Sequence, residues 1–513
     1  MIIGDIIRRN AKRYPKKAAL IFGNSRYTFE ELNSRVNSLV NGLIALGLNK
    51  GDRIAVLLDS CPQFVELYCA AGKGGLVLVP LNCRLSSQDL TYLVNNAEAN
   101  TLVLGANYLS LLDSMRFDLK IVKNFIIVGG NDKGMTSYDD LLSQHPSNEP
   151  NLEIREEDLV YLLYTSGTTG LPKGIMHTHK TILACMLNYM VMAGVKRDDV
   201  SLAVCPPFWG PILVFHTFPH FYMGASIVLL KDFDSKIVLE TIEREKVTTT
   251  FLIPPQIVSI VDYPHLDKYN TRSLRYVLFG GIPLSPEVLK RAAAAFGNIF
   301  NNAYGLIEET PVSILPAEDM ILEGSPQEVK RLASCGREAI NVEVRVVDDY
   351  GRDIAPGETG EVIARGDNMM KGYWKLPQVT EEAFRGGYLH TGDLATVDTE
   401  GYIYLIGRKK DVITSGGKAI YPTEVEEVIY HHPSISEATV FGIPDERLGE
   451  VSVAVVVVKE GKKVTSEEVM ALCQQNLPSY AVPSSVVLAD SLPRSPTGKV
   501  LRRLLQEKYS STA

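Results

Sequence analysis

The sequence of 513 residues lacks a long apolar run. Its strongest run, Val451 to Val458, has eight residues and includes Ser452, whereas a helix that crosses a bilayer needs roughly 18–20. The β-branched residues of this run are typical of a buried strand. The N-terminal segment Met1 to Asn10 places Arg8 and Arg9 after its isoleucines, the reverse of a secretory signal. We therefore expect no membrane-spanning helix, and we expect an amphipathic helix at the N-terminus.

Paired cysteines and clustered histidines are also missing. The seven cysteines are widely spaced and form no C-x-x-C pair, which is typical of a reducing compartment and offers no framework for a metal. His177 and His179 stand two residues apart and His431 is adjacent to His432, but neither pair has further ligands nearby. We expect these histidines to be structural or solvated, and the protein to be cytoplasmic.

An excess of positive charge is absent as well. The chain has 52 Lys and Arg against 60 Asp and Glu, which gives a net charge of -8. Proteins that bind nucleic acid usually concentrate Lys and Arg on one face, so this balance argues against nucleic acid as a partner. It leaves a small-molecule site open. At about 100–200 residues per domain, the length predicts a multi-domain enzyme.

Short apolar runs alternate with helical patterns over most of the chain, which predicts an α/β fold with mainly parallel strands. From about residue 335, strands broken by turns predict a β-rich unit, and the charged stretch Gly407 to Asp411 marks the expected domain boundary. Residues 1–409 are expected to form a large, multi-layer N-terminal domain that includes the β-rich subdomain at 335–409. Residues 410–513 are expected to form a small, mobile α+β C-terminal domain.

The most informative segment is the loop Tyr164 to Gly174, which follows an apolar strand. It contains three glycines, several Ser and Thr hydroxyls, and Lys173. Glycines allow backbone N–H groups to approach a phosphate, hydroxyls donate to its oxygens, and lysine adds positive charge. A Walker A loop is excluded because its lysine follows glycine and precedes Ser or Thr, whereas Lys173 lies between Pro172 and Gly174. Composition alone also fits a flexible turn.

As a whole, this loop resembles the phosphate loop of the adenylate-forming superfamily, in its acyl-CoA synthetase branch. Further motifs occur in the family's order along nearly the whole chain. They are Gly280 to Leu284, Asn302 to Glu308, Tyr388 to Asp393, Arg408 to Asp411, Ser415 to Lys418, and Pro493 to Lys499. One glycine-rich loop is weak evidence, but seven ordered matches are specific.

The resemblance implies roles for individual residues in activating a carboxylic acid with ATP. Lys499 would neutralise the two anions that meet when the carboxylate attacks the α-phosphate, Glu308 would bind Mg²⁺, and Thr165 would act with them. CoA would contact Gly416, Gly417 and Lys418, and Lys410 would be the hinge of a domain rotation. The implied ATP and AMP contacts are Thr165, Ser166, Gly167, Thr168, Thr169, Gly170, Lys173, Gly280, Gly281, Ile282, Asn302, Ala303, Tyr304, Gly305, Asp393 and Arg408.

Two positions depart from the family pattern. Ile307 stands where the family usually has a threonine, and Trp209 stands where related synthetases commonly have histidine after an aromatic residue. The first departure removes a hydroxyl from the phosphate site. The second puts a bulky ring in the predicted acyl pocket, for which the candidate residues are Phe208, Trp209, His216 and Ile253.

The sequence therefore predicts an ATP-dependent acyl-CoA ligase that forms AMP and pyrophosphate, with CoA as co-substrate and Mg²⁺ as cofactor. The acid is expected to be fatty or otherwise hydrophobic, because the acyl-pocket segments offer no buried Asp for an amino acid; Asp232 and Asp234 lie in a polar turn. Loading of a separate carrier protein, luciferase-like oxidation, a catalytically silent nucleotide-binding protein and a peripheral membrane module are the alternatives. The protein is expected to be a monomer or homodimer.

Overall fold

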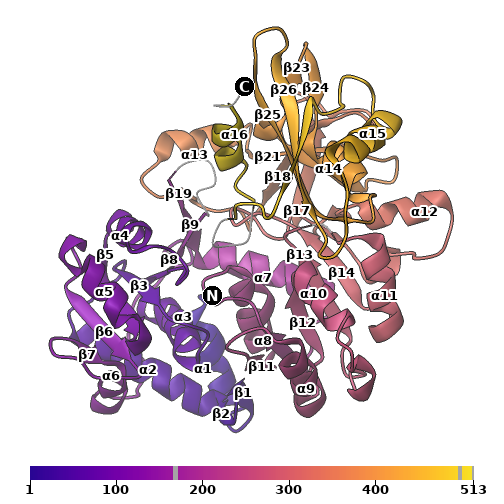
Figure 1. Ribbon diagram of the computed structural model, residues 1–513. Helices are drawn as coiled ribbons and strands as arrows, with labels where there is room; N and C mark the ends of the chain where they lie inside the picture. The colour runs from indigo at the N-terminus through magenta and orange to yellow at the C-terminus, as the bar shows by residue number, and fades with distance from the viewer. Residues whose placement is uncertain (166–170, 283, 495–499, 511–513) are drawn as a thin grey trace. The chain divides into compact units, whose positions relative to one another are not determined.

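The computed structural model describes residues 1–165, 171–282, 284–494 and 500–510 (Figure 1). The chain divides into two compact units. Unit 1 comprises residues 1–165, 173–344 and 364–389, and unit 2 comprises residues 166–172, 345–363 and 390–513. Within the described ranges, no helix has both the length and the apolar character needed to cross a bilayer.

The larger sheet of unit 1 is parallel at its centre and antiparallel at both edges. Its described strands follow the order β16-β15-β14-β13-β12-β10-β11-β1-β2. The antiparallel pairs are β1 with β2, β14 with β15, and β15 with β16. The strand bounds are β1 Ala18–Phe22, β2 Ser25–Thr28, β10 Val200–Ala203, β11 Ser226–Leu229, β12 Thr249–Leu252, β13 Tyr276–Gly280, β14 Phe300–Tyr304, β15 Ser313–Leu315 and β16 Arg337–Glu338.

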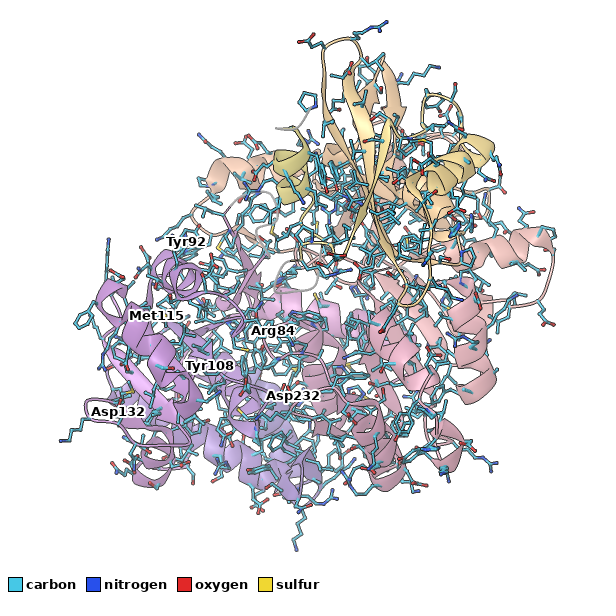
Figure 2. The ribbon with its side chains drawn as sticks, in the orientation of Figure 1. Arg84, Tyr92, Tyr108, Met115, Asp132 and Asp232 are labelled. Carbon is cyan, nitrogen blue, oxygen red and sulfur yellow. The ribbon has the colours of Figure 1, made fainter. Side chains whose placement is uncertain are left out.

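The second sheet of unit 1 has the strand order β19-β9-β8-β4-β3-β5-β6-β7. Tyr92, Tyr108 and Met115, labelled in Figure 2, belong to an apolar cluster that also includes side chains from its strands. The bounds are β3 Arg53–Leu57, β4 Val77–Pro80, β5 Ala99–Gly105, β6 Asn124–Val128, β7 Thr136–Ser137, β8 Leu159–Tyr164, β9 Gly174–Thr178 and β19 Gly372–Tyr373.

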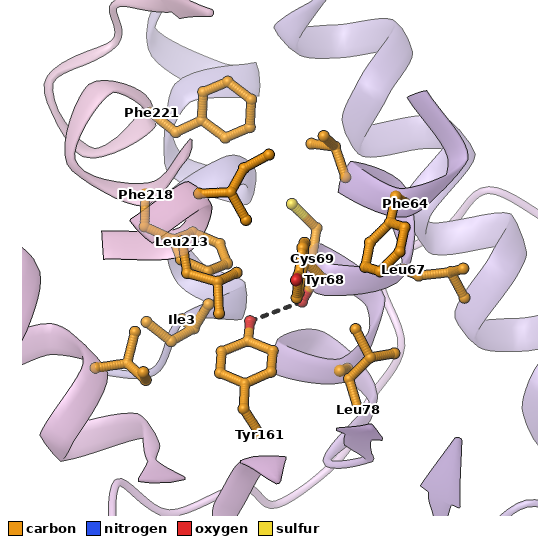
Figure 3. Close-up of a cluster of buried hydrophobic side chains, with 14 of the residues drawn as sticks. Ile3, Phe64, Leu67, Tyr68, Cys69, Leu78, Tyr161, Leu213, Phe218 and Phe221 are labelled. Atoms are coloured by element: carbon orange, nitrogen blue, oxygen red, sulfur yellow. Dashed lines mark hydrogen bonds between the residues drawn. The ribbon is translucent and has the colours of Figure 1, made fainter. Parts of the chain in front are cut away.

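Several helices of unit 1 pack apolar side chains into a shared core. Tyr68, at the centre of this core, accepts a hydrogen bond on its carbonyl oxygen from the Tyr161 hydroxyl at 3.0 Å (Figure 3). The main helices are α1 Gly4–Arg13, α2 Phe29–Ala45, α3 Pro62–Gly74, α4 Ser87–Asn96, α5 Leu109–Met115, α6 Tyr138–Gln144, α7 His179–Ala193, α8 Phe218–Met223, α9 Ser235–Glu245, α10 Pro254–Val261, α11 Pro286–Phe296, α12 Pro326–Lys330 and α13 Pro377–Ala383.

Local sequence explains where these helices begin and end. In α7, the Thr178 side chain accepts from the backbone N–H of Thr181, and the Thr178 backbone N–H donates to the Thr181 side chain. This reciprocal cap satisfies donors that the first turn leaves without partners. The helix ends at Gly194, whose φ of 52° is left-handed and favours glycine.

The β-rich sheet is built from strands β17 Val342–Val347, β18 Gly360–Gly366, β20 Phe384–Arg385, β21 Tyr388–Val397 and β22 Ile403–Arg408. Its order is β17-β18-β21-β20, with β22 paired to β21. The alternation of short strands and turns predicted this sheet correctly.

Unit 2 also contains a mixed sheet in the order β24-β23-β26-β25, with β27 paired to β26. The predicted α+β character of the C-terminal region is confirmed by α14 Pro422–Tyr430, β25 Ile435–Asp445, β26 Gly449–Val458, α15 Ser466–Asn476 and β27 Ser485–Ala489. The sequence did not predict the hairpin of β23 Ile413–Ser415 and β24 Lys418–Ile420, or helix α16 Arg502–Ser510. Strands of three residues carry too short a pattern to be recognised.

Two neutral histidines lie in the core of unit 1, where a π-helical turn at Ile212–Thr217 leads into α8. His216 Nδ1 lies 2.9 Å from Ser201 Oγ, and His220 Nε2 lies 2.9 Å from Thr249 Oγ1. Burial lowers the pKa of His216 to about 3 and that of His220 to about 4.

These pKa values predict a loss of stability in acid. The unfolded chain binds protons at histidine near pH 6.5, but the folded chain leaves His216 and His220 neutral down to about pH 3 and 4. Their contribution to the free energy of unfolding is therefore complete above pH 6.5. It is lost as pH falls toward 4, by up to about 1.4 kcal/mol per pH unit for each histidine. We expect the double variant His216→Asn/His220→Gln to show a shallower dependence of urea-unfolding free energy on pH between 6.5 and 5.

A matched variant, His265→Asn, changes an exposed histidine and should retain the wild-type slope. An equal slope in the double variant and the wild type would contradict the assignment of this pH dependence to the core histidines.

Candidate active site

Three polar side chains of unit 1 meet where strands β9 and β19 pair and the turn after β14 approaches them. Lys173 Nζ lies 4.9 Å from the centre of the Tyr373 ring. The hydroxyl of Tyr373 donates to Glu308 Oε1 at 2.9 Å. Tyr373 therefore links the lysine of the predicted phosphate loop to the predicted metal ligand.

Backbone hydrogen bonds hold these residues in place. The Met370 N–H donates to the Glu308 carbonyl at 2.7 Å, and the Trp374 N–H donates to the Gly174 carbonyl at 2.7 Å. Strand β19 pairs antiparallel with β9, with Tyr373 opposite Ile175. The positions of Lys173 and Glu308 thus depend on a short strand far from both in sequence.

The base of the predicted phosphate loop is closed by two hydrogen bonds. The Thr165 N–H donates to the Lys173 carbonyl, and the Lys173 N–H donates to Thr165 Oγ1, both at 3.1 Å. Strands β8 and β9 on either side pair antiparallel, so the segment is the connection of a hairpin. Five of the predicted contacts lie outside the described residues: Ser166, Gly167, Thr168, Thr169 and Gly170.

Several of the predicted ATP and AMP contacts lie together at the carboxyl ends of two parallel strands. Gly280 of β13 is opposite Ala303 of β14, and a Cβ on Gly280 would collide with the Ala303 carbonyl oxygen. Asn302 is half-buried, and its amide donates to the Ser334 carbonyl at 3.3 Å. The carboxyl edge of a parallel sheet is the usual ligand site of α/β folds.

The other predicted contacts at this edge surround the same strand ends. Gly281 and Ile282 follow β13 directly, with Ile282 exposed, and Tyr304 and Gly305 close β14. The Tyr304 carbonyl accepts from the Val312 N–H at 2.8 Å. The structure thus brings Gly280 to Ile282 and Asn302 to Gly305 to one edge of the sheet.

The turn with the unusual Ile307 is fixed through its backbone. His177 Nε2 lies 2.8 Å from the Ile307 carbonyl and donates to it, while the Ile307 side chain is exposed. Burial lowers the pKa of His177 to about 4, so the imidazole is neutral and serves as a fixed donor. His177 is therefore structural, as predicted.

In unit 2, the predicted ATP and AMP contacts Asp393 and Arg408 form an ion pair. Asp393 of β21 lies opposite Arg408 of β22, and Arg408 Nε lies 2.6 Å from Asp393 Oδ1. Asp393 is buried, and its N–H donates to Thr391 Oγ1 at 3.0 Å. A carboxylate oriented in this way can accept hydrogen bonds from two vicinal hydroxyls.

The predicted CoA contacts lie in the hairpin between β23 and β24. Gly416 and Gly417 form its turn with φ values of 55° and 76°, which favour glycine. Lys418 Nζ lies 4.9 Å from the centre of the Tyr480 ring. Gly416, Lys418 and Tyr480 line a cleft of about 320 Å³ within unit 2.

Two further predicted residues, Lys410 and Lys499, belong to the sequence of unit 2. Lys410 lies in the single 3₁₀ turn Lys409–Asp411 directly after β22. The neighbouring Asp411 pairs with Arg502 of α16 at 3.0 Å. Lys499 lies outside the described residues, between Arg494 and Val500, which form a bridge.

The four predicted acyl-pocket residues have different surroundings. Phe208 and Trp209 are half-buried, with ring centres 6.5 Å apart and nearly perpendicular planes. Trp209 and Ile253 pack against the main core. His216 is fully buried beside Ser201, so its surroundings are those of a core residue.

Sequence reasoning missed Tyr373. It lies 65 positions after Glu308 in the chain, in a strand of two residues, and nothing in its neighbourhood identifies it as part of a site. Its proximity to Lys173 depends on the pairing of β19 with β9. The only signal in the sequence is an aromatic pair, Tyr373 and Trp374, after a glycine.

Comparison with known proteins places the chain in a family. A model of the AMP-binding enzyme family matches residues 7–374, and a model of its C-terminal domain matches residues 424–499. Feruloyl-CoA synthase from Amycolatopsis sp is 33% identical over 501 residues, which cover 98% of each chain. The long-chain fatty-acid–CoA ligase FadD13 from Mycobacterium tuberculosis is 32% identical over 516 residues, which cover 99% of each chain.

The fold is shared as well. The crystal structure of ATP-bound MatB from Rhodopseudomonas palustris superimposes with a TM-score of 0.88 at 26% identity and covers 100% of both chains. The chain therefore belongs to the adenylate-forming AMP-binding enzyme family, in its acyl-CoA ligase branch.

Proposed function

We propose that the protein converts a hydrophobic carboxylic acid, ATP and CoA into acyl-CoA, AMP and pyrophosphate as a cytoplasmic monomer or homodimer. The carboxylate attacks the α-phosphate of ATP, pyrophosphate leaves, and the CoA thiol then displaces AMP from the acyl-adenylate. The observation that carries this proposal is the arrangement of Lys173, Tyr373 and Glu308, beside strand ends suited to a nucleotide.

The proposal assigns polyphosphate binding to the loop between β8 and β9. Lys173 supplies positive charge at the end of this loop, and Tyr373 limits its motion through a cation–π contact at 4.9 Å. A fixed cation stabilises the charge that develops as pyrophosphate leaves, and it needs no reorganisation during the step. Thr165, Ser166, Gly167, Thr168, Thr169 and Gly170 are proposed to contribute the remaining donors.

Glu308 is the proposed ligand of Mg²⁺. No group of three or more His, Cys, Asp or Glu suited to a metal occurs in the described part of the chain, so Glu308 would act together with phosphate oxygens. Such a site, with one carboxylate and substrate phosphates, is typical of Mg²⁺. When bound, Mg²⁺ would neutralise phosphate charge. The Tyr373 hydroxyl donates a hydrogen bond to Glu308 Oε1 at 2.9 Å and so orients the carboxylate.

Other residues are proposed to orient the nucleotide and supply charge. Asp393 accepts hydrogen bonds from the ribose hydroxyls, and its ion pair with Arg408 holds the carboxylate in position. Lys499 neutralises the carboxylate and the α-phosphate as they approach. The remaining proposed nucleotide contacts are Gly280, Gly281, Ile282, Asn302, Ala303, Tyr304 and Gly305.

For thioester formation, we propose that CoA contacts Gly416, Gly417 and Lys418. Lys499 and this glycine pair both follow Lys410 in the sequence. A rotation of residues 410–513 about Lys410 would therefore exchange them between the two half-reactions. The cleft of about 320 Å³ beside Lys418 and Tyr480 supports a ligand-binding role for this hairpin.

The hydrophobic nature of the acid is supported by Phe208, Trp209 and Ile253, which offer aromatic and aliphatic surfaces. The acyl-pocket segments of the sequence offer no buried Asp that could pair with the ammonium group of an amino acid. Asp232 and Asp234 are exposed, and Asp234 is used as the N-cap of α9.

The direct test is a screen of pyrophosphate release with aliphatic, aromatic and amino acids, each with and without CoA. We expect hydrophobic acids to give CoA-dependent turnover with equal amounts of AMP and acyl-CoA. Turnover that required a carrier protein in place of CoA, or O₂ consumption with a luciferin, would instead identify one of the alternative reactions. Failure of every acid would contradict the ligase proposal.

Replacing Lys499 should separate the two half-reactions. We expect Lys499→Ala to slow adenylate formation by about 10²-fold or more, because a charge aimed at the reacting atoms is lost. Thioester formation from supplied acyl-adenylate should persist. Single-turnover assays of each half-reaction measure both effects, and Lys463→Ala, at an exposed position of the same unit, is the control. Equal loss in both half-reactions would contradict the assigned role.

Removing the Tyr373 hydroxyl should weaken the metal site while preserving the ring beneath Lys173. For Tyr373→Phe, we expect about tenfold more Mg²⁺ to be needed for half-maximal adenylation, since partners that orient a metal ligand affect metal affinity on this scale. The measurement is a Mg²⁺ titration at saturating ATP.

Tyr388→Phe is the matched control because the Tyr388 hydroxyl also bonds a glutamate, Glu343, that is not assigned to the site. Its Mg²⁺ requirement should equal that of the wild type. An unchanged requirement in Tyr373→Phe would show that Tyr373 does not position Glu308.

A further inference from the structure

Two segments of the site in unit 1 meet at Asn96, the last residue of helix α4. The first segment is the start of the loop between β8 and β9. The hydroxyl of Tyr164, the last residue of β8, donates to Asn96 Oδ1 at 2.7 Å. The second segment follows β19, where the indole Nε1 of Trp374 donates to the Asn96 carbonyl at 3.0 Å. Asn96 therefore joins two segments that are far apart in the sequence.

The position of Asn96 in its helix explains why its carbonyl is available. The last four carbonyl groups of a helix have no partner within the helix, so this one can accept from an indole. The chain then turns sharply, since Glu98 has a left-handed φ of 52°. Arg53 holds this turn by donating to the Ala97 carbonyl at 3.0 Å and to the Glu98 carbonyl at 2.9 Å. Asn96 is thus fixed by contacts outside the phosphate site.

The Trp374 indole is fixed from several directions. The guanidinium carbon of Arg53 lies 5.6 Å from the centre of its ring system, and the Trp374 N–H donates to the Gly174 carbonyl at 2.7 Å. A Cβ on Gly174 would lie 3.2 Å from both Trp374 Cβ and Tyr164 Cζ. Gly174, which directly follows Lys173, is therefore enclosed between the two residues that donate to Asn96.

Both donors adjoin residues that shape the phosphate site. Tyr164 directly precedes Thr165, whose N–H and Oγ1 close the loop onto Lys173 with hydrogen bonds of 3.1 Å. Trp374 directly follows Tyr373, whose ring centre lies 4.9 Å from Lys173 Nζ. A shift of either donor would therefore move the ends of the loop or the ring that contacts its lysine.

We propose that Asn96 is a positioning residue for the β- and γ-phosphates of ATP. It acts through Tyr164 and Trp374, which hold the two ends of the loop and the Tyr373 ring in one arrangement, and it does not itself contact the nucleotide. The inference rests on the polyphosphate role proposed above for this loop. AMP lacks the two phosphates concerned, so its binding should not depend on Asn96.

The test compares the dissociation constants of ATP with Mg²⁺ and of AMP, measured by isothermal titration calorimetry on the full chain without acid. For Asn96→Ala and for Tyr164→Phe, we expect the Kd of ATP to rise about tenfold, because a lost hydrogen bond leaves its partner unsatisfied and the loop ends shift. The Kd of AMP should stay at its wild-type value. A general loss of structure at the nucleotide site would weaken both ligands.

Asn95→Ala is the matched control. Asn95 belongs to the same helix end, donates to the Asp118 carbonyl at 2.8 Å and accepts from the Lys120 N–H at 3.2 Å. The control therefore also loses two side-chain hydrogen bonds, but neither of them leads to the loop, and it should keep the wild-type affinity for ATP. If Asn96→Ala does not fold, Tyr164→Phe still provides the test, because it removes a single hydroxyl.

The contact between Asn96 and Trp374 is tested separately by fluorescence. The chain has two tryptophans, so Trp374 is the sole emitter in a Trp209→Phe background. In that background we expect acrylamide to quench Trp374 more strongly after Asn96→Ala or Tyr164→Phe than before. Asn95→Ala should leave the quenching unchanged.

The outcomes separate this inference from the proposed function. ATP binding by the wild type with unchanged affinity in both Asn96→Ala and Tyr164→Phe, or an equal weakening of ATP and AMP, would overturn the role of Asn96 alone. Unchanged quenching of Trp374 in both variants would overturn the proposed link through Asn96. A wild type that bound no ATP would overturn the proposed function and this inference with it.

Discussion

The arrangement of the site in unit 1 depends on the contact of Tyr373 with both Lys173 and Glu308. The Tyr373 ring holds the lysine at 4.9 Å and its hydroxyl holds the carboxylate at 2.9 Å. A lysine and a carboxylate that contacted each other directly would form an ion pair and compete with a ligand for both charges. An aromatic ring placed between them keeps each near the other while leaving both charges available to a nucleotide and its metal ion.

The sheets provide the rigidity that this contact requires. Strand β19 reaches the site only because it pairs with β9, and β14 reaches it because Gly280 lets β13 approach Ala303 closely. The turn after β14 is fixed again by His177 at the Ile307 carbonyl. Ile307 replaces the family's threonine without loosening the backbone, because its carbonyl, and not its side chain, is the atom that is held. A chain of the AMP-forming acid–CoA ligase class thus retains the framework of its site despite this departure.

The fold class and several candidate site residues could be predicted from the sequence, for identifiable reasons. The fold class followed from short apolar runs such as Val451 to Val458, which lies within strand β26. Glu308, Asp393 and Arg408 could be proposed as site residues because each lies in a contiguous motif. Tyr373 could not, because it acts through a partner 65 positions away. The roles assigned to the predicted site residues remain predictions, and those of Lys499 and the residues 166–170 concern positions outside the described structure.

The most direct test of the central claim is the acid-dependent exchange of labelled pyrophosphate into ATP by the wild type and by Glu308→Gln, measured without CoA. If Glu308 lies at the site of adenylate formation, a hydrophobic acid will support exchange by the wild type, and the variant will lose about 10²-fold or more of it. Exchange that continued at the wild-type rate in Glu308→Gln, across the full range of Mg²⁺ concentrations, would contradict the account.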